Sequence, residues 1–419
     1  MKQTLQNGKL FLNKFKKNQE AKTVAANFIF LSLIKLAGFI FPLIVLPYLT
    51  SVIGAEYFGV LSFASAIIVF FETFTDWGFN FTATRDVAQN RDNINKISEI
   101  YSEVFFGRML LMTIAFIILL CLTYAIPSLV EFRLLLILTF LYIPGNTIFS
   151  EWVFQAVERM KFITYLNLLS KLVFTLLIFV VIKQKEDYIY QPLLYACGFI
   201  VSGVFAQIII RQKLGLHLHI PSLSNIFARI KRSTNMFISL FLPNLYTNFT
   251  TILLKSFGGE VATGIYSGGQ RLQTIIDHLT SILSRSFFPY LARHREKHHI
   301  YVKISGAISI AASLVMFFGA DLFVSIFLAD GFEQSALVMK IFSPTPFFLF
   351  LMNSYGTNYL VLIGKEYILR NIILLCSIFG FVLSWIITVR YSFVGAAVTV
   401  SVVWAIRGFL TYFYARKYK

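Results

Sequence analysis

Charged residues are scarce in this chain, which excludes an ordinary water-soluble domain. Only 14% of the 419 residues are Asp, Glu, Lys or Arg, whereas 57% are hydrophobic and the mean hydropathy is +0.72. A helix needs about 20 residues to cross the ~30 Å hydrocarbon layer of a bilayer. Several runs of about that length or longer contain no charge at all, namely 109–130, 188–210, 233–254, 341–364 and 371–389. We therefore expect an integral membrane protein.

Cysteines are few, and catalytic motifs are missing. Cys121, Cys197 and Cys376 lie inside apolar runs at spacings that suit neither a metal site nor a redox pair, so we interpret them as small buried hydrophobes. The sequence contains no paired-aspartate metal motif, no His-Glu-x-x-His and no glycine-rich phosphate loop. The first apolar stretch is too long for a cleavable signal peptide and is expected to remain as the first span. We predict no catalytic residue, no metal and no cofactor.

A net charge of +17 is compatible with nucleic-acid binding, but the distribution of the charge argues against that partner. The basic excess lies between apolar spans rather than on one soluble face. The spans are predicted near 27–50, 59–79, 103–126, 134–156, 162–182, 189–210, 234–255, 262–289, 304–328, 334–362, 367–389 and 392–413. The predicted fold is therefore an all-α polytopic membrane protein with about twelve transmembrane helices.

Lys and Arg are distributed unequally between the two sets of loops. The tails and the loops at 80–102, 157–161, 211–233, 290–303 and 364–370 carry 25 of them, whereas the alternate loops at 51–58, 127–133, 183–188, 255–261, 329–333 and 390–391 carry 5. Short loops rich in Lys and Arg stay in the cytoplasm. Both termini are therefore predicted to be cytoplasmic, which requires an even number of spans.

The turn after the first predicted span is repeated after the seventh. Ser51, Gly54, Gly59 and Ser62 share the spacing Ser-x2-Gly-x4-Gly-x2-Ser with four residues that lie 205 positions later, which are Ser256, Gly259, Gly264 and Ser267. Six spans per half give the halves the same orientation, so the repeat is parallel, and a substrate cavity is expected between the halves. We predict a cytoplasmic tail at 1–26, one six-helix bundle at 27–210, a basic linker at 211–233, a second bundle at 234–413 and a cytoplasmic tail at 414–419.

Seven basic residues fall inside predicted spans, where each is costly unless it faces water or protein interior. Arg271, His278 and Arg285 recur every seven residues and drift only ~20° per step, which places them on one face of the eighth span. Arg271 either lines a cavity or pairs with Asp277 or another buried acid for a structural reason. The remaining intramembrane cations are Lys35, Arg108, Lys171, Lys340 and Arg407, of which Arg108, Arg407, Lys35 and also Arg285 lie near enough to the cytoplasmic ends to snorkel.

Other spans carry polar stripes. One stripe includes Asn167 and Lys171, and another includes Asn244 and Asn248. Such residues either hold helices together or line a cavity. Together with the basic stripe they outline a hydrated, positively charged cavity, which favours an anionic substrate and, for guanidinium groups, phosphate in particular.

Acidic residues in or near spans are fewer, and they are Glu72, Asp76, Glu151 and Asp277. Glu72 and Asp76 lie one helical turn apart. They either neutralise Arg85 or Lys35 in a structural ion pair or carry a proton in a coupled transport cycle.

A series of short motifs runs along most of the chain. In the N-terminal half it consists of Pro47-Tyr48-Leu49-Thr50, Gly54, Phe58-Gly59-Val60, Asp76-Trp77-Gly78-Phe79-Asn80 and Thr84-Arg85-Asp86. It continues through Glu151, Gln155, Glu158, Asn167, Gly264-Ile265-Tyr266-Ser267, Gln270-Arg271-Leu272 and Pro289. In these motifs the sequence resembles bacterial polysaccharide-repeat flippases, the Wzx-type O-antigen and capsule transporters of the MOP exporter superfamily.

This resemblance implies two six-helix bundles around a central cationic cavity. It also implies movement of an undecaprenyl-diphosphate-linked oligosaccharide across the bacterial inner membrane by alternating access coupled to a proton or sodium gradient. Membrane lipids, a polysaccharide polymerase and a chain-length regulator are the implied partners. By matching position, Arg85 and Arg271 are expected to bind the diphosphate, together with Lys171, Lys35, Lys340, His278, Arg285 and Arg407.

Two other functions are compatible with a protein of this kind. A membrane glycosyltransferase or polymerase of the same pathway normally needs a sizeable outward loop or a carboxylate cluster, and no outward loop here exceeds about ten residues. A MATE-like exporter of small cations is expected to have an acidic cavity, whereas the predicted cavity is basic. Both are weaker interpretations than the flippase.

Overall fold

The computed structural model describes residues 41–293 and 295–418, and every regular element in these two ranges is a helix. The chain is helical over 41–76 and then forms fifteen α-helices and four short helical pieces of other types within the described residues. The α-helices are α2 (Phe79–Gln89), α3 (Ile94–Ala125), α4 (Pro127–Val130), α5 (Arg133–Phe140), α6 (Tyr142–Phe149), α7 (Glu151–Ala156), α8 (Met160–Val181), α9 (Gln191–Lys213), α10 (Leu223–Phe241), α11 (Asn248–Arg293), α12 (His298–Phe318), α13 (Ala320–Phe327), α14 (Ser335–Phe342), α15 (Thr345–Leu351) and α16 (Glu366–Lys417). Short 3₁₀ turns cover Lys185–Tyr190, Leu242–Leu245 and Arg295–Lys297, and Met352–Val361 is a π-helix.

Nine helical segments in the described residues are long and apolar enough to cross a membrane. The three longest, Phe41–Gln89, Leu223–His278 and Glu366–Lys417, are each interrupted between two predicted spans by a residue with positive φ, at Gly54 (70°), Gly259 (84°) and Ser392 (52°). A Cβ added to Gly380 would lie 2.9 Å from Cγ2 of Val403, which shows that the two arms on either side of Ser392 pack against each other. Divided at these three residues, the nine segments give twelve helical pieces among the described residues, and the prediction of an all-helical multi-pass membrane fold is confirmed.

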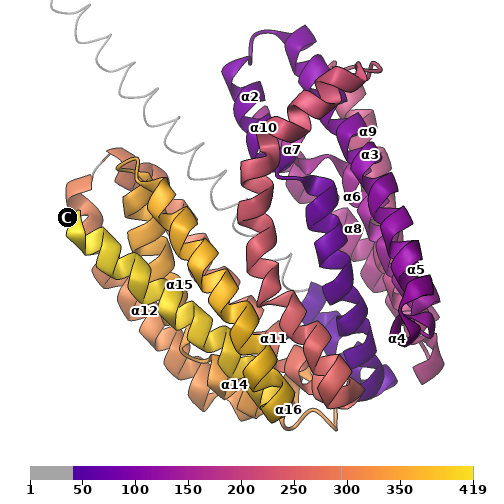
Figure 1. The fold of residues 1–419 in the computed structure, drawn as a ribbon, viewed down its shortest axis with the longest axis vertical. Coiled ribbons are helices and arrows are strands. Elements are labelled where there is room, and N and C mark those ends of the chain that lie inside the picture. Colours follow the sequence, from indigo (N-terminus) through magenta and orange to yellow (C-terminus); the bar gives the residue numbers. More distant parts are fainter. Residues whose placement is uncertain (1–40, 294, 419) are drawn as a thin grey trace, which may run out of the picture.

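The two halves of the chain form separate bundles that converge toward the bottom of the view in Figure 1. Small side chains allow close packing within the N-terminal bundle, as is usual between membrane helices. Ser202 of α9 donates a 2.8 Å hydrogen bond to the carbonyl of Leu166 in α8. In the C-terminal bundle, the Thr250 and Ser384 hydroxyls lie 2.7 Å apart and join α11 to α16.

The repeated glycines lie at the contact between the halves. A Cβ on Gly59 would overlap the carbonyl oxygen of Glu260, and a Cβ on Gly264 would overlap that of Ala55. Ala55 and Glu260 are themselves 205 positions apart, so the contact is reciprocal, as expected for two copies related by a two-fold axis. The repeated spacing therefore corresponds to a place where two backbones approach too closely for any side chain.

Two predicted boundaries differ from the structure. The third span begins at Ile94 rather than near 103, and α10 begins at Leu223 rather than near 234. Ser222 caps α10 by accepting a hydrogen bond from the amide of Asn225, and this cap falls inside the predicted linker 211–233. Figure 1 shows α10 lying on the N-terminal bundle, so this segment is a structural part of that bundle rather than a free connection. Most of the first predicted span, 27–50, lies outside the described residues.

Candidate functional site

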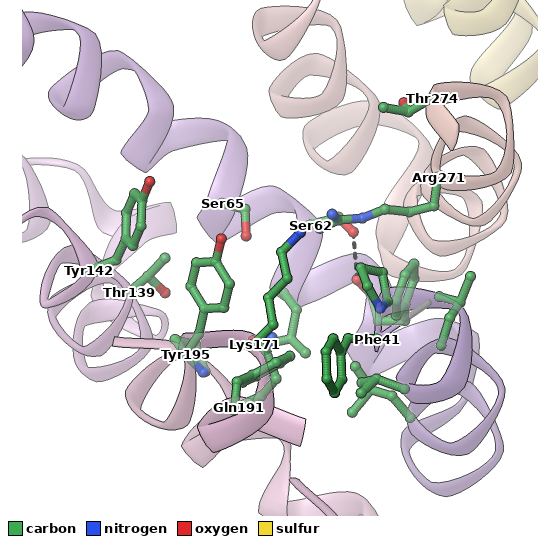
Figure 2. A pocket seen from close by; sticks show the side chains of 18 of the residues that line it. Phe41, Ser62, Ser65, Thr139, Tyr142, Lys171, Gln191, Tyr195, Arg271 and Thr274 are labelled. Carbon is green, nitrogen blue, oxygen red and sulfur yellow. Dashed lines mark hydrogen bonds between the residues drawn. The ribbon is translucent and has the colours of Figure 1, made fainter. Parts of the chain in front are cut away.

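A cavity of about 530 Å³ lies between the two halves. Its walls come from helical residues 41–76, from α5, α6, α8 and α9 of the N-terminal half, and from α11 of the C-terminal half (Figure 2). This volume lies within the roughly 300–1,000 Å³ range that is typical of ligand pockets. The N-terminal half supplies most of the wall, and the C-terminal half contributes residues of one helix.

Two of the predicted cations face this cavity from opposite halves. Lys171 projects from α8 and Arg271 from α11, and Figure 2 shows their charged ends directed toward each other across the space. His278 lines the cavity two helical turns from Arg271. The side chain of Arg285, the third residue of the predicted basic stripe, lies outside the described residues.

The predicted alternative, in which Arg271 pairs with Asp277, is not observed. Asp277 is buried and accepts a hydrogen bond from Gln273, which also donates to Thr345 at 3.2 Å. Among the described residues, no carboxylate lies within 4 Å of Arg271. Arg271 is therefore available to a ligand in the cavity, whereas Asp277 belongs to the packing of the C-terminal bundle.

The opposite wall of the cavity combines a carboxylate with aromatic rings. Glu72 accepts hydrogen bonds from the Tyr142 hydroxyl (3.0 Å) and the Asn146 amide (3.1 Å). The ring of Tyr195 lies 5.2 Å from that of Tyr142. Gln191, Thr139, Ser62 and Ser65 add further polar groups. We did not predict Tyr142, Tyr195 or Gln191 from the sequence, because a tyrosine in an apolar run has no signal that separates a cavity wall from ordinary packing.

Three other predicted cations among the described residues do not line this cavity. Arg85 is exposed on α2, with its Nε 3.6 Å from Asp86. Lys340 pairs with Asp321 at 2.7 Å and so joins α14 to α13. Arg407 lines a different cavity inside the C-terminal half. Lys35 lies outside the described residues.

The predicted polar residues have mainly structural contacts. The Asn244 amide donates to the Thr73 hydroxyl (3.0 Å), and Asn248 donates to the Asn244 carbonyl oxygen (2.9 Å), so this stripe ties the seventh span to the second. Asn167 is half-buried on α8 and does not line the central cavity, and Glu151 is exposed at the start of α7. These four residues therefore do not line the central cavity.

The Asp76 carboxylate makes an ion pair, but its partner is neither Arg85 nor Lys35. It pairs with Arg108 of α3, a buried side chain that also donates to Asn80 at 2.8 Å. Arg108 therefore does not snorkel to the cytoplasmic surface. A buried guanidinium with two oxygen partners is compensated where it lies.

A second buried ion-pair network holds α10 against the N-terminal half, and we call Asp86, Glu103 and Arg229 the α10 clamp. Arg229 lies 2.5 Å from Asp86 and 2.6 Å from Glu103, and all three side chains are at least nine-tenths buried. Beside the clamp, the Trp77 ring stacks on Phe237 of α10 with centroids 4.0 Å apart. Arg229 was counted as a loop residue, so its burial was not predicted.

The halves also meet at the end that carries the weakly charged loops, and we call this contact the closed end. It comprises the Gly59–Gly264 crossing, the Ala329 amide donating to the Thr50 hydroxyl (3.2 Å), and an edge contact between Phe58 and Phe332. Lys255 of α11 lies 4.1 Å from the centroid of the Phe132 ring and 3.7 Å from Glu131, both in the N-terminal half. These contacts close the cavity toward that end.

Comparison with known proteins identifies relatives along most of the chain. The model of a family described as "Polysaccharide biosynthesis protein" matches residues 24–295. A protein of Escherichia coli (strain K12) is 26% identical over 393 residues, which is 91% of this chain and 94% of that protein. One of Shigella dysenteriae is 26% identical over 364 residues, or 84% and 90%. Both are named "Putative O-antigen transporter".

Solved structures with the same fold include transporters. The lipid II flippase MurJ, in an inward closed conformation, has a TM-score of 0.75 at 14% identity, with 93% of this chain and 87% of that chain covered. An inward-facing multidrug resistance MATE transporter of the MOP superfamily has a TM-score of 0.58 at 15% identity, with 92% and 94% covered. At these identities the likeness shows the fold, which is the predicted MATE and MOP type.

Proposed function

Because the chain belongs to the polysaccharide biosynthesis protein family, we propose that it is a flippase for an undecaprenyl-diphosphate-linked oligosaccharide repeat unit, such as that of an O antigen or a capsule. It is a transporter of the Wzx type rather than an enzyme. In this proposal the protein lies in the bacterial cytoplasmic membrane with its basic loops and both termini inside, because Lys and Arg are retained on the cytoplasmic side. A polysaccharide polymerase and a chain-length regulator would then act on its product.

One observation carries the proposal: Lys171 and Arg271, from opposite halves, line one cavity. A diphosphate bridges two cations of this kind, because a guanidinium donates paired hydrogen bonds to phosphate oxygens and an ammonium supplies a point charge. A ligand that touches both halves is also bound differently when the halves rock apart, which alternating access between two repeats requires.

The aromatic and carboxylate wall suits the sugar part of such a substrate. Glu72 is an acceptor, Gln191 is both a donor and an acceptor, and the rings of Tyr142 and Tyr195 offer apolar faces. A MATE-like exporter of cations is disfavoured, because Glu72 is the only carboxylate among the described residues that line the cavity, whereas Lys171, Arg271 and His278 are basic.

The proposal is tested in a strain whose surface polysaccharide depends on this gene. Replacing Lys171 or Arg271 with alanine is expected to lower surface polymer at least about tenfold, because each change removes a charge-assisted hydrogen bond. Lys340→Ala is the matched control, since Lys340 pairs with Asp321 away from the cavity. Normal surface polymer in Arg271→Ala, with the protein present at wild-type level, would rule out the assigned role of that residue.

A further inference from the structure

A second cavity, of about 340 Å³, lies inside the C-terminal half and shares no lining residue with the central cavity. Its walls come from the 3₁₀ turn at Leu242–Leu245, from α15, from the π-helix Met352–Val361 and from both arms of α16. The family resemblance does not account for this cavity, because the proposed substrate enters between the halves.

Arg407 is the only charged residue among the twelve that line this second cavity. Among the described residues, no carboxylate lies within 4 Å of its guanidinium. A guanidinium stays protonated in proteins, and a charge at membrane depth is stable only where water or a counter-ion meets it. Arg108 shows the contrast, since its guanidinium is paired with Asp76. Arg407 therefore requires an anion or water from outside the chain.

The groups around Arg407 include several that can donate a hydrogen bond. Trp404 lies one helical turn before Arg407 on the same face of α16, and its buried indole Nε1 has no hydrogen-bond partner within the described residues. Asn353 and Thr357 reach the cavity from the π-helix. π-Helical stretches are rare and occur frequently at functional sites. An indole N–H donates only, and a guanidinium accepts nothing.

We propose that this second cavity is a binding site for a phosphate-type anion. Arg407 supplies the positive charge, and the Trp404 indole, the Asn353 amide and the Thr357 hydroxyl supply hydrogen-bond donors. No carboxylate lines the cavity, so the site does not suit a metal cation. The volume, near the lower end of the roughly 300–1,000 Å³ range of ligand pockets, suits one phosphate or a phosphodiester headgroup rather than an oligosaccharide.

The proximity of Trp404 to Arg407 provides the readout. The full chain is purified in an uncharged detergent and titrated with inorganic phosphate at constant ionic strength, with chloride as the control anion, while tryptophan fluorescence is recorded. Phosphate is expected to change the emission of the wild type and of Arg271→Gln, which alters only the central cavity. Arg407→Gln is expected to weaken phosphate binding at least about tenfold, because a charge-assisted hydrogen bond is lost. Trp404→Phe is expected to lose the signal.

A second arm distinguishes the two sources of phosphate. The protein is placed in phosphatidylcholine nanodiscs with or without phosphatidylglycerol, and the same emission is followed. A response to free phosphate identifies a soluble anion, and a response to phosphatidylglycerol alone identifies a lipid headgroup. Identical titrations for Arg407→Gln and the wild type, or no response to either probe, would overturn the proposal.

The conservative variant Arg407→Lys covers the case in which Arg407→Gln does not accumulate. Lysine keeps the charge but not the forked donor geometry, so binding is expected to weaken and to remain measurable. An unchanged affinity in Arg407→Lys would also overturn the site. None of these outcomes depends on flippase activity, so this proposal and the proposed function fail separately.

Discussion

The α10 clamp and the closed end both join the two halves of the sequence, but with different kinds of contact. In the clamp, Arg229 is buried between two carboxylates at 2.5 and 2.6 Å. At the closed end, the contacts are a glycine crossing, one hydrogen bond from Ala329 to Thr50, and Lys255 packed against Phe132. The α10 clamp is a buried guanidinium paired with two carboxylates, whereas the closed end is a set of weak interactions.

For the proposed alternating-access cycle, this difference predicts which contacts are kept and which are broken. Separating a buried ion pair leaves uncompensated charge in a low dielectric, which is strongly unfavourable. Weak apolar and cation–π contacts are released at a small cost and allow two arrangements of similar energy. We therefore expect α10 to stay with the N-terminal half while the closed end opens.

The largest effect is expected from Arg229→Ala. This change leaves Glu103 buried without a counter-ion and leaves Asp86 with only the exposed Arg85 and Arg232, and breaking a buried ion pair typically costs about 3–5 kcal/mol. The variant is expected to accumulate poorly, and its unfolding temperature in detergent should fall by several degrees in a thermal-shift assay. Arg232→Ala is the matched control, because Arg232 also pairs with Asp86 but is 53% exposed and should change the stability by less than about 1 kcal/mol.

Equal losses of stability for Arg229→Ala and Arg232→Ala would contradict the stabilising role assigned to the α10 clamp. A third variant sharpens the result, in which Arg229→Met is combined with Asp86→Asn and Glu103→Gln. Replacing a whole buried ion pair by groups of similar volume is often neutral, so part of the stability should return.

Gly59→Val is expected to have the next largest effect, and on transport rather than on accumulation. A side chain at position 59 overlaps the Glu260 carbonyl, so the two helices cannot approach and the closed end cannot form. Surface polymer should fall at least about tenfold, because the arrangement in which the closed end is formed is lost. Gly107→Ala is the control, since its added Cβ meets the Phe79 ring at an ordinary 3.4 Å. Normal polymer in Gly59→Val would show that the crossing is not needed.

Lys255→Met is expected to have the smallest effect. It removes the cation–π contact with Phe132 and the ion pair with Glu131, together worth roughly 0.5–2 kcal/mol. In a background without the native cysteines, Thr50→Cys should then react about two- to tenfold faster with a membrane-impermeant thiol reagent. Lys183→Met, at the same end but bonded to the Phe179 carbonyl of its own helix, should leave the rate unchanged. A faster rate in both variants would mean that the effect is not specific to the contact between the halves.

The architecture could be predicted from sequence because its signals are local or periodic. Long uncharged runs predicted the spans, and the repeated Ser and Gly spacing predicted two parallel halves, whereas the contact between the halves at these glycines is seen only in the structure. The start of α10 was missed, because its first three turns carry Arg229, Lys231 and Arg232 and look like a polar linker. Only the contact with Asp86 and Glu103 shows that one of these three charges is buried.

The candidate site was predicted in part. Lys171, Arg271 and His278 do line the central cavity, whereas Lys340 and Arg407 do not. Periodicity along one helix shows which residues share a face, but not which neighbour that face meets. In the wall formed by Glu72, Tyr142 and Tyr195, only Glu72 had a signal in the sequence, as an acidic residue within a span, whereas the two tyrosines come from other helices and had none.

The sequence by itself determined that the protein crosses the membrane many times, which loops are basic and where its two halves repeat. These properties depend on the free energy of placing each residue in hydrocarbon or in water, which is set by the residue and its near neighbours. The tertiary structure alone decided which buried charges are compensated. Arg108, Arg229 and Lys340 meet carboxylates from other helices, whereas Arg271 and Arg407 face cavities, because electrostatic compensation depends on distances between helices that are far apart in sequence.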